Sequence, residues 1–334
     1  MSEDNKNLAD IKDLSVSFMT DAGSIKAVED VNFTIPRKTV VGVVGESGSG
    51  KSVTARSIIK LLPETATTSG AVYLSKRDGS DSLDVLSLSG EQLREVRGSE
   101  AAMVFQEPNS VLNPVYTIGW QIEEGLRAHG MKDKKELRAK AIDILKKVGI
   151  PDAETRVDYY PHQFSGGQKQ RIVIAMALVL NPGLILADEP TTALDVTVQA
   201  QILDLLREMQ DRVGASIIMI THDLGVVAEV SDKVAVMYAG RKVEEGSVEQ
   251  ILFNPQHPYT KALKGCIPHL QRTPTSGRHR LHEIPGMVLG MAELGKDRCS
   301  FYERCPCGKP ECMEHNPPAK AIDAGHEVAC WLYS

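Results

Sequence analysis

The chain has 334 residues, of which 42% are hydrophobic and 25% are charged, and its formal net charge is −6. This composition is typical of a soluble globular protein with a sizeable core. The acidic balance argues against a nucleic-acid-binding protein, which usually carries a basic field. The longest apolar run covers nine residues, 172–180, whereas a membrane-spanning helix needs about 20. We therefore predict no membrane span, and the polar, acidic start of the sequence predicts no signal peptide.

The first 253 residues alternate strand-like runs with amphipathic helical stretches. Short aliphatic runs at residues 40–44, 102–105, 184–187 and 216–220 predict strands that are buried on both faces. Apolar residues fall on one helical face of residues 134–148, which predicts a helix there. Strands that alternate with helices favour an α/β fold with a largely parallel sheet.

A glycine-rich stretch follows the first of these buried strands. Residues 45–52 fit the phosphate-binding pattern G-x-x-x-x-G-K-[ST]. The glycines let backbone N–H groups point at phosphate oxygens, and the next helix adds the positive end of its dipole. Lys51 is expected to contact the β- and γ-phosphates, and Ser52 to ligate Mg²⁺. A surface turn would not need a strand before it and a helix after it, so we predict that ATP is bound by Gly45, Glu46, Ser47, Gly48, Ser49, Gly50, Lys51 and Ser52.

Two carboxylates end the strand predicted at residues 184–187. Asp188 can hold the Mg²⁺ in the manner of a Walker-B aspartate. Glu189, one residue later, can polarise the attacking water as a general base. Acidic pairs are common at solvated strand ends, but the phosphate-binding loop earlier in the chain favours the catalytic interpretation.

The sequence Phe-Ser-Gly-Gly-Gln at residues 164–168, followed by Lys-Gln-Arg, resembles the signature motif of ABC ATPases. Many members carry leucine where this chain has phenylalanine. The serine and glycines open a helix whose N-terminus can face a phosphate. The resemblance implies that this phosphate belongs to ATP held by the opposite subunit of a head-to-tail dimer. The residues that would serve the partner's ATP are Ser165, Gly166, Gly167 and Gln168.

Other positions match the same family in order. Gln106 matches the Q-loop, which implies roles in catalysis and at the Mg²⁺. Residues 192–195 match the D-loop, which ends at Asp195, and His222 matches the switch histidine that contacts the γ-phosphate. Phe18 fits the aromatic residue that stacks on adenine in this family, although a core position would explain it equally well.

The resemblance implies an α/β fold of the ABC-type P-loop NTPases. This fold has a RecA-like core, an antiparallel β subdomain and a helical subdomain that carries the signature. Composition shifts near residue 254, because all six cysteines, six of nine histidines and nine of seventeen prolines lie in residues 254–334. We therefore predict an ABC nucleotide-binding domain at residues 1–253 and a small, irregular Cys- and Pro-rich domain at residues 254–334.

Across nearly its whole length the chain resembles the D-type ATPase subunit of dipeptide and oligopeptide importers. The resemblance rests on an extended Q-loop at residues 106–114, on Asn-Pro-Gln-His-Pro-Tyr-Thr at residues 254–260 and on Ile-Pro-Gly at residues 284–286. It implies peptide import at the cytoplasmic face of the cell membrane, where the chain is peripheral and binds no nucleic acid. The implied partners are two integral membrane permease subunits, a sister ATPase of the F-type and an extracytoplasmic peptide-binding protein.

Several alternatives to this interpretation stay open. Nickel, glutathione and oligosaccharide importers have similar ATPases, and the sister subunit could be a second copy of this chain. A soluble ABC ATPase that remodels DNA or ribosomes is the alternative from another class. Such proteins commonly carry two ATPase domains, a long coiled coil or a basic surface, which this sequence lacks.

The C-terminal cysteines form a further candidate site. Cys299, Cys305, Cys312 and Cys330 are separated by five, six and seventeen residues, and a proline follows the second. Structural zinc sites usually begin with a C-x₂₋₄-C knuckle, whereas wide spacings and a Cys-Pro step are more compatible with an iron–sulfur cluster. The family resemblance also implies a [4Fe–4S] cluster on these four residues. Zinc and unliganded cysteines are the alternatives, and Cys307 adds a fifth thiol.

Overall fold

The computed structural model describes residues 7–21, 23–192, 194–267, 284–287 and 298–333. Ala193 of the predicted D-loop and the first six residues lie outside this range. The strands are β1 (Asn7–Thr20), β2 (Gly23–Pro36), β3 (Val40–Val44), β4 (Ala66–Ser75), β5 (Ser82–Asp84), β6 (Ala101–Val104), β7 (Leu184–Asp188), β8 (Ser216–Thr221), β9 (Lys233–Tyr238), β10 (Arg241–Ser247), β11 (Ala319–Asp323) and β12 (His326–Ala329).

The α-helices lie between these strands and in the C-terminal part. They are α1 (Lys51–Ile58), α2 (Gly90–Ser99), α3 (Pro108–Val111), α4 (Ile118–Ala128), α5 (Lys134–Lys147), α6 (Ala153–Arg156), α7 (Gly166–Leu178), α8 (Val196–Val213), α9 (Leu224–Val230), α10 (Val248–Phe253), α11 (Pro258–Gly265) and α13 (Glu311–Glu314). Short 3₁₀ turns are η2 (Val85–Ser87), η3 (Pro161–Gln163) and η4 (Tyr302–Arg304). The strands and the helix expected from the sequence pattern are thereby confirmed.

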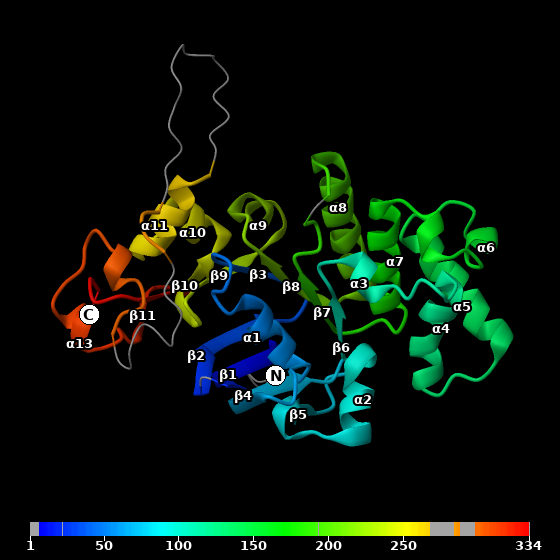
Figure 1. Ribbon diagram of the computed structural model, residues 1–334, viewed down its shortest axis with the longest axis horizontal. Helices are drawn as coiled ribbons and strands as arrows, with labels where there is room; N and C mark the ends of the chain where they lie inside the picture. Colours follow the sequence, from blue (N-terminus) through cyan, green and yellow to red (C-terminus); the bar gives the residue numbers. More distant parts are fainter. Residues whose placement is uncertain (1–6, 22, 193, 268–283, 288–297, 334) are drawn as a thin grey trace, which may run out of the picture.

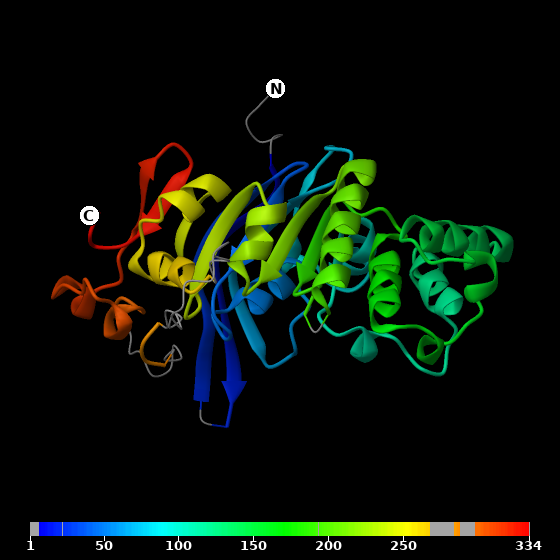
Figure 2. The same cartoon turned by 90° about the horizontal axis from the view of Figure 1, so that it is seen from above.

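Within the described residues the strands form two sheets. The larger has eight strands in the order β11-β12-β10-β9-β3-β8-β7-β6, and its part from β9 to β6 is parallel. The smaller is antiparallel, in the order β2-β1-β4-β5. Figures 1 and 2 show α1 between the two sheets, while α4, α5 and α6 form a lobe at one end of the molecule and the β11–β12 hairpin lies at the other.

Apolar clusters cover both faces of the parallel strands. In β8, Ile217 and Met219 belong to the cluster shared with α7 and α8, whereas Ile218 and Ile220 belong to the cluster shared with α1 and the antiparallel sheet. Successive side chains of a strand point to opposite faces, and both faces are covered here. This arrangement explains why the central strands are continuous aliphatic runs.

The parallel register aligns the carboxyl ends of the central strands. Val44, which ends β3, lies opposite Thr221, which ends β8. Asp188, which ends β7, lies opposite Ile220 of β8. Ligands of open α/β sheets bind beyond this edge. The segments that leave it carry the phosphate-binding loop, Gln106, Glu189 and His222.

The C-terminal segment is more regular than its composition predicts. Strand β12 pairs with β10 of the ATPase sheet, with Val328 opposite Glu244, and β11 pairs with β12. Phe301, which is 1% exposed, packs its ring 5.1 Å from that of Tyr238 and 5.4 Å from that of Tyr259, measured between centroids. The tail therefore shares a core with the ATPase, and the boundary at residues 253 and 254 stays a prediction.

No helix in the described part of the chain has both the length and the apolar character that crossing a membrane requires.

A buried carboxylate ties the tail to the sheet. Glu244 of β10 is 1% exposed and accepts the backbone N–H groups of Gln256 and His257 at 2.7 and 2.9 Å. Its other neighbour is Nε2 of His326 in β12, at 2.8 Å. One side chain thus satisfies polar groups from β12 and from the loop before α11.

We expect Glu244→Ala to lower the free energy of unfolding by at least about 3 kcal/mol, because buried donors lose their acceptor. Glu208→Ala is the matched control, since Glu208 forms an exposed i,i+4 pair with Arg212 that contributes about 0.5 kcal/mol or less. Urea unfolding followed by circular dichroism measures both values. Equal effects of the two substitutions would contradict the role assigned to Glu244.

Candidate functional site

The phosphate-binding loop leaves β3 through a backbone conformation that requires glycine. Gly45 has a φ of +156°, and a Cβ there would lie 2.1 Å from the carbonyl oxygen of Met237 in β9. Gly50, with a φ of +94°, is the N-cap of α1. Both angles are rare for residues that carry a side chain. The loop is therefore pressed against the sheet and curls around the first residue of α1.

Lys51 lies inside this curl. Its ammonium group donates to the carbonyl oxygens of Gly45 and Glu46, at 2.8 Å each, and the residue is 6% exposed. Burial lowers the pKa of Lys51, and the nearby carboxylates of Glu189 and Asp188 act in the opposite direction. The loop thus holds a positive charge where β- and γ-phosphates would enter.

Ser52 and Asp188 meet beneath the loop. The Ser52 hydroxyl donates to Oδ1 of Asp188 at 2.7 Å, and Arg56 of α1 lies 3.5 Å from the other oxygen of the carboxylate. Two oxygen donors side by side are the kind of group that Mg²⁺ prefers. The sequence motifs identified Ser52 and Asp188 but not Arg56.

Glu189 is held by three side chains from different loops. Its carboxylate accepts from Gln106 Nε2 at 3.0 Å and from the Thr192 hydroxyl at 2.8 Å, and His222 Nδ1 lies 3.2 Å away. Glu189 has a φ of +46°, a strained angle for a residue with a side chain and common at functional sites. The three predicted catalytic residues are therefore brought together, with Thr192 as an additional partner.

The surroundings of Glu189 keep its carboxyl group ionised. Burial raises the pKa of Glu189. The hydrogen bonds from Thr192 and His222, together with the charges of His222 and Lys51, lower the pKa by more than burial raises it, so that it lies below the usual value. An ionised carboxylate is the form that a general base needs before it accepts a proton.

These groups surround one cavity of about 1070 Å³. Its wall also includes Ile25, Gly240 and Leu263, from β2, the β9–β10 turn and α11. Phe18, which was predicted to stack on adenine, packs against the apolar cluster of the antiparallel sheet. Its cross-strand neighbour Ile25 lines the cavity. Residues from the tail and from both sheets thus enclose the candidate ATP site.

The signature residues lie at the start of α7, away from this wall. Ser165 accepts the N–H of Gln168 at 3.3 Å, and the Gln168 side chain accepts the N–H of Ser165 at 3.2 Å. A Cβ on Gly167 would lie 2.7 Å from a methyl group of Val198 in α8, so glycine permits the close approach of the two helices. Asp195 caps α8 by accepting the N–H of Val198 at 2.9 Å. In the described structure, none of the residues 165–168 lines the cavity.

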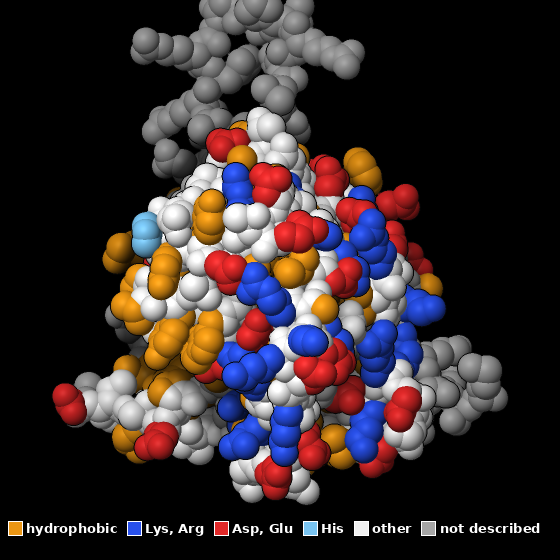
Figure 3. Space-filling model, turned by 90° about the vertical axis from the view of Figure 1, so that its right-hand side faces the viewer, with side chains coloured by type: hydrophobic (Ala, Val, Ile, Leu, Met, Phe, Trp, Pro, Cys, Tyr) orange, Lys and Arg blue, Asp and Glu red, His pale blue; other side chains and the backbone are white. Residues whose placement is uncertain are grey.

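The lobe formed by α4, α5 and α6 carries mixed charge and an apolar flank. Figure 3 shows Lys, Arg, Asp and Glu side chains interspersed on this end of the molecule, with hydrophobic side chains gathered along one side. Just beyond the Q-loop, Val115 is 70% exposed, and the rings of Tyr116 and Trp120 stack with centroids 4.1 Å apart. Exposed apolar groups of this kind mark contact surfaces.

The tail cysteines gather around a second, small cavity. It measures about 10 Å³, and its wall includes Cys299, Cys305, Cys307, Cys312 and Cys330. Burial raises the pKa of Cys299 to about 11 and also raises the pKa values of Cys305 and Cys330. Among the described residues, no group of three or more His, Cys, Asp or Glu side chains has the arrangement to hold a metal ion.

Comparison with known proteins agrees with this geometry. Residues 28–192 match the family described as "ABC transporter", and residues 243–312 match "Oligopeptide/dipeptide transporter, C-terminal region". A relative from Sinorhizobium fredii, named "Probable peptide ABC transporter ATP-binding protein y4tR", is 47% identical over 327 residues, which cover 97% of this chain and 94% of the relative. The chain belongs to the ATP-binding proteins of ABC transporters.

Solved structures agree with this assignment. The ATP-binding cassette MJ0796, described as a dimer in a post-hydrolysis state with ADP and Pi, is 30% identical, with a TM-score of 0.62 over 72% of this chain and 98% of the cassette. The structure of cbiO1 from Clostridium perfringens, part of an ABC transporter complex, has a TM-score of 0.61 at 30% identity, over 75% of this chain and 92% of its own. The predicted ABC-type fold is confirmed, and the chain is an ATPase of this type.

We expect Lys51→Ala to weaken ATP binding by about tenfold or more, because the loop loses both its positive charge and the bonds that hold its curl. Titration with the fluorescent analogue mant-ATP measures this change. Lys140→Ala, which removes an exposed i,i+4 pair with Glu136, should bind as the unaltered chain does. Unchanged affinity in Lys51→Ala would count against the role assigned to the lysine.

Proposed function

We propose that this ABC ATPase powers the import of peptides across the cell membrane, and that it is a peripheral subunit at the cytoplasmic face. Its partners would be two integral membrane permease subunits, a sister ATPase of the F-type and an extracytoplasmic peptide-binding protein. Two comparisons support this cargo: the match of residues 243–312 to the oligopeptide/dipeptide transporter C-terminal region, and the name of the relative from Sinorhizobium fredii.

One observation carries the catalytic part of the proposal. Lys51, Ser52, Gln106, Glu189 and His222 face a single cavity although they come from separate segments of the chain. Lys51 would bind the β- and γ-phosphates, with the N–H groups of residues 45–52 directed at their oxygens. This placement leaves the γ-phosphate near Glu189 and His222.

The oxygen donors beneath the loop suit a magnesium ion. Ser52 and Asp188, already 2.7 Å apart, would hold it, and Gln106 would approach it from the Q-loop. When bound, Mg²⁺ neutralises charge on the β- and γ-phosphate oxygens. Asp188 lies beside Arg56 and Ser52 and offers a carboxylate oxygen to the ion.

Glu189 would act as the general base. Its carboxylate would accept a hydrogen bond from the attacking water and take a proton as the water oxygen bonds to the γ-phosphorus, while the bond from that phosphorus to the bridging oxygen breaks and ADP leaves with that oxygen. Gln106, Thr192 and His222 restrict the orientation of the carboxylate. His222 would also donate to the γ-phosphate, which would link the presence of that group to the position of Glu189.

A head-to-tail dimer would complete this site. The N-terminus of α7 at Ser165, Gly166 and Gly167 is suited to a phosphate, since helix N-termini present N–H groups to anions. These residues are absent from the wall of the chain's own cavity in the described structure. They would serve ATP on the sister subunit, with Asp195 of the D-loop at the same interface.

The apolar flank of the helical lobe suits the permease subunits. Val115, Tyr116 and Trp120 follow the extended Q-loop that begins at Gln106, and all three are exposed. Movement of Gln106 on nucleotide binding would therefore be passed to a docked membrane subunit through this short segment.

The cysteines would hold a [4Fe–4S] cluster. Cys299, Cys305, Cys312 and Cys330 face a common cavity, and thiolate is the ligand that iron–sulfur clusters use. Among the described residues these side chains are not arranged to hold a metal ion, so the segments that carry them would have to shift when a cluster binds. The cluster would crosslink the segments of the tail that contain these four residues. Because burial raises the pKa values of Cys299, Cys305 and Cys330, binding must release protons.

The importer assignment is tested with the native complex. The chain, purified from detergent-solubilised membranes, should retain two membrane subunits and a second ATPase. After reconstitution in proteoliposomes it should drive ATP-dependent uptake of labelled peptides delivered by the binding protein. Recovery with ribosomes or DNA, or uptake of nickel or oligosaccharide in place of peptide, would contradict the proposal.

We expect Glu189→Gln to bind ATP normally but to lose at least about 99% of turnover, because the amide cannot accept the proton. The ATP-bound dimer should then accumulate, which size-exclusion chromatography with light scattering detects. Glu208→Gln, on the exposed face of α8, is the control. Turnover near that of the unaltered chain would show that Glu189 is not the base.

The cluster proposal is tested by anaerobic purification followed by iron and acid-labile sulfide analysis and visible absorption spectroscopy. We expect about four irons per chain. Replacement of Cys312 with serine should lower this content, whereas replacement of Cys266 should not. Stoichiometric zinc without iron would contradict the proposal.

A further inference from the structure

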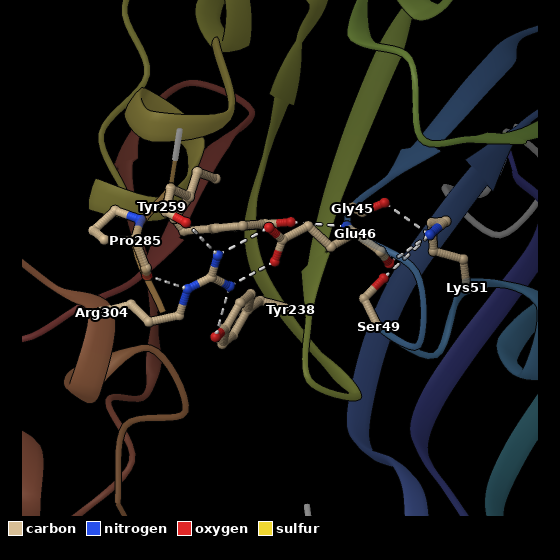
Figure 4. Close-up of polar contacts among 9 residues, drawn as sticks. Gly45, Glu46, Ser49, Lys51, Tyr238, Tyr259, Pro285 and Arg304 are labelled. Carbon is tan, nitrogen blue, oxygen red and sulfur yellow. Dashed lines mark hydrogen bonds and ion pairs between the residues drawn. The ribbon is translucent and has the colours of Figure 1, made fainter. Parts of the chain in front are cut away.

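A residue of the phosphate-binding loop is held by the C-terminal tail. Glu46, the second residue of the loop, uses its carbonyl oxygen to accept from Lys51 at 2.8 Å. Its backbone N–H donates to the hydroxyl of Tyr259 in α11 at 2.9 Å. Its carboxylate accepts hydrogen bonds from both terminal nitrogens of Arg304, at 2.6 and 3.0 Å. Figure 4 shows Tyr259 and Arg304 reaching this residue from the tail, on the side opposite Lys51.

Arg304 is fully engaged in this arrangement. Its Nε donates to the carbonyl oxygen of Pro285 at 2.9 Å, and its terminal nitrogens also donate to the carbonyl of Ile284 at 3.2 Å and the hydroxyl of Tyr238 at 3.3 Å. With the two bonds to Glu46, all five N–H groups of the guanidinium have an acceptor. The side chain is 5% exposed, so the phosphate-binding loop, β9 and the tail together form a closed socket for this arginine.

The charge of Glu46 makes this socket relevant to ATP. A carboxylate beside the loop repels the triphosphate and offers Lys51 a competing partner. The charge of the Glu46 carboxylate raises the pKa of Lys51, against the larger effect of burial. Arg304 holds the carboxylate on the side opposite Lys51 (Figure 4) and neutralises it with a bidentate pair, the strongest form of such a contact. Lys51 is left with backbone carbonyls, which phosphate oxygens can displace.

We propose that Arg304 and Tyr259 are positioning residues for the phosphate-binding loop, so that the C-terminal tail is part of the ATP site. The inference rests on ATP binding at this loop and is independent of the cargo and of the cluster. Arg304 fixes the carboxylate of Glu46, and Tyr259 fixes its backbone N–H. Together they hold the first turn of the loop in the shape that directs Lys51 into the cavity.

The same socket connects the ATP site to the cysteine segment. Arg304 directly precedes Cys305, and Phe301, at the start of the same turn, packs against Tyr238 and Tyr259. The backbone N–H of Cys299 donates to the carbonyl of Cys312 at 2.8 Å. A conformational change in the cysteine segment would therefore alter the position of Arg304, because only a few residues separate the two.

Substitutions in the full-length chain, read by mant-ATP titration, test the proposal. We expect Arg304→Gln to raise the Kd about tenfold, the size of effect expected from one uncompensated charge near the phosphates. Glu46→Gln breaks the same ion pair but leaves no negative charge, so its effect should be much smaller. In the double variant, Glu46→Gln should restore most of the affinity that Arg304→Gln loses.

This asymmetry separates control of the Glu46 charge by Arg304 from a purely structural role in the tail. If Arg304 only stabilised the tail, the two single variants would weaken binding alike, and the double variant would not recover. Arg138→Gln is the matched control, because Arg138 forms a bidentate pair with Asp158 at 2.6 and 2.7 Å on the helical lobe. It should leave the Kd unchanged. Unchanged affinity in Arg304→Gln, or equal loss in the two single variants, would overturn the proposal.

A second variant covers the case in which Arg304→Gln does not fold. Tyr259→Phe keeps the buried ring and removes only the hydroxyl that accepts from Glu46, so it should raise the Kd while the unfolding temperature changes little. An unchanged Kd would overturn the proposal. Failure of the unaltered chain to bind mant-ATP would instead overturn the ATP-site assignment, with Lys51→Ala as the reference for lost binding.

Discussion

The parallel register of β3, β7 and β8 is the constraint on which the rest of the site depends. It places the ends of these strands at one edge, with Val44 opposite Thr221 and Asp188 opposite Ile220. The phosphate-binding loop, the Asp188–Glu189 pair and His222 then follow the strands directly. No side chain needs a long reach, because the backbone has already brought the three segments together. A one-residue slip would move every side chain of the shifted strand to the other face.

Much of this arrangement could be predicted from the sequence, because it follows from local chemistry. The glycines of residues 45–52 and the aliphatic run before them determine a strand, a tight loop and a helix. The pair Asp188 and Glu189 stands at the end of a recognisable strand. The resemblance to ABC ATPases added Gln106 and His222, whose sequence context alone is unremarkable.

What the sequence did not predict depends on long-range packing. Arg56 beneath Asp188, Ile25 on the cavity wall, and Arg304 on Glu46 have no characteristic spacing, since their partners lie far away in the chain. The C-terminal hairpin was also missed, because its two short strands are specified by pairing with β10 and not by their own composition. Composition identified the tail as distinct, but the structure joins its core to that of the ATPase.

The C-terminal tail is joined to the ATPase by three sets of contacts. Glu244 links it to the sheet, Phe301 links it to the aromatic core, and Arg304 links it to the loop that binds phosphate. In the proposed dimer, such a subunit would adjust its nucleotide site through its own C-terminal segment, and the signature at Ser165 would act on the nucleotide of its sister.

The composite ATP site is the central claim, and a structure of the ATP-bound importer tests it most directly. The γ-phosphate should lie between Lys51 of this chain and the signature serine of the sister subunit, with Ser165 at the sister's nucleotide in the same way. ATP enclosed by this chain alone, with Ser165 facing solvent, would contradict the account.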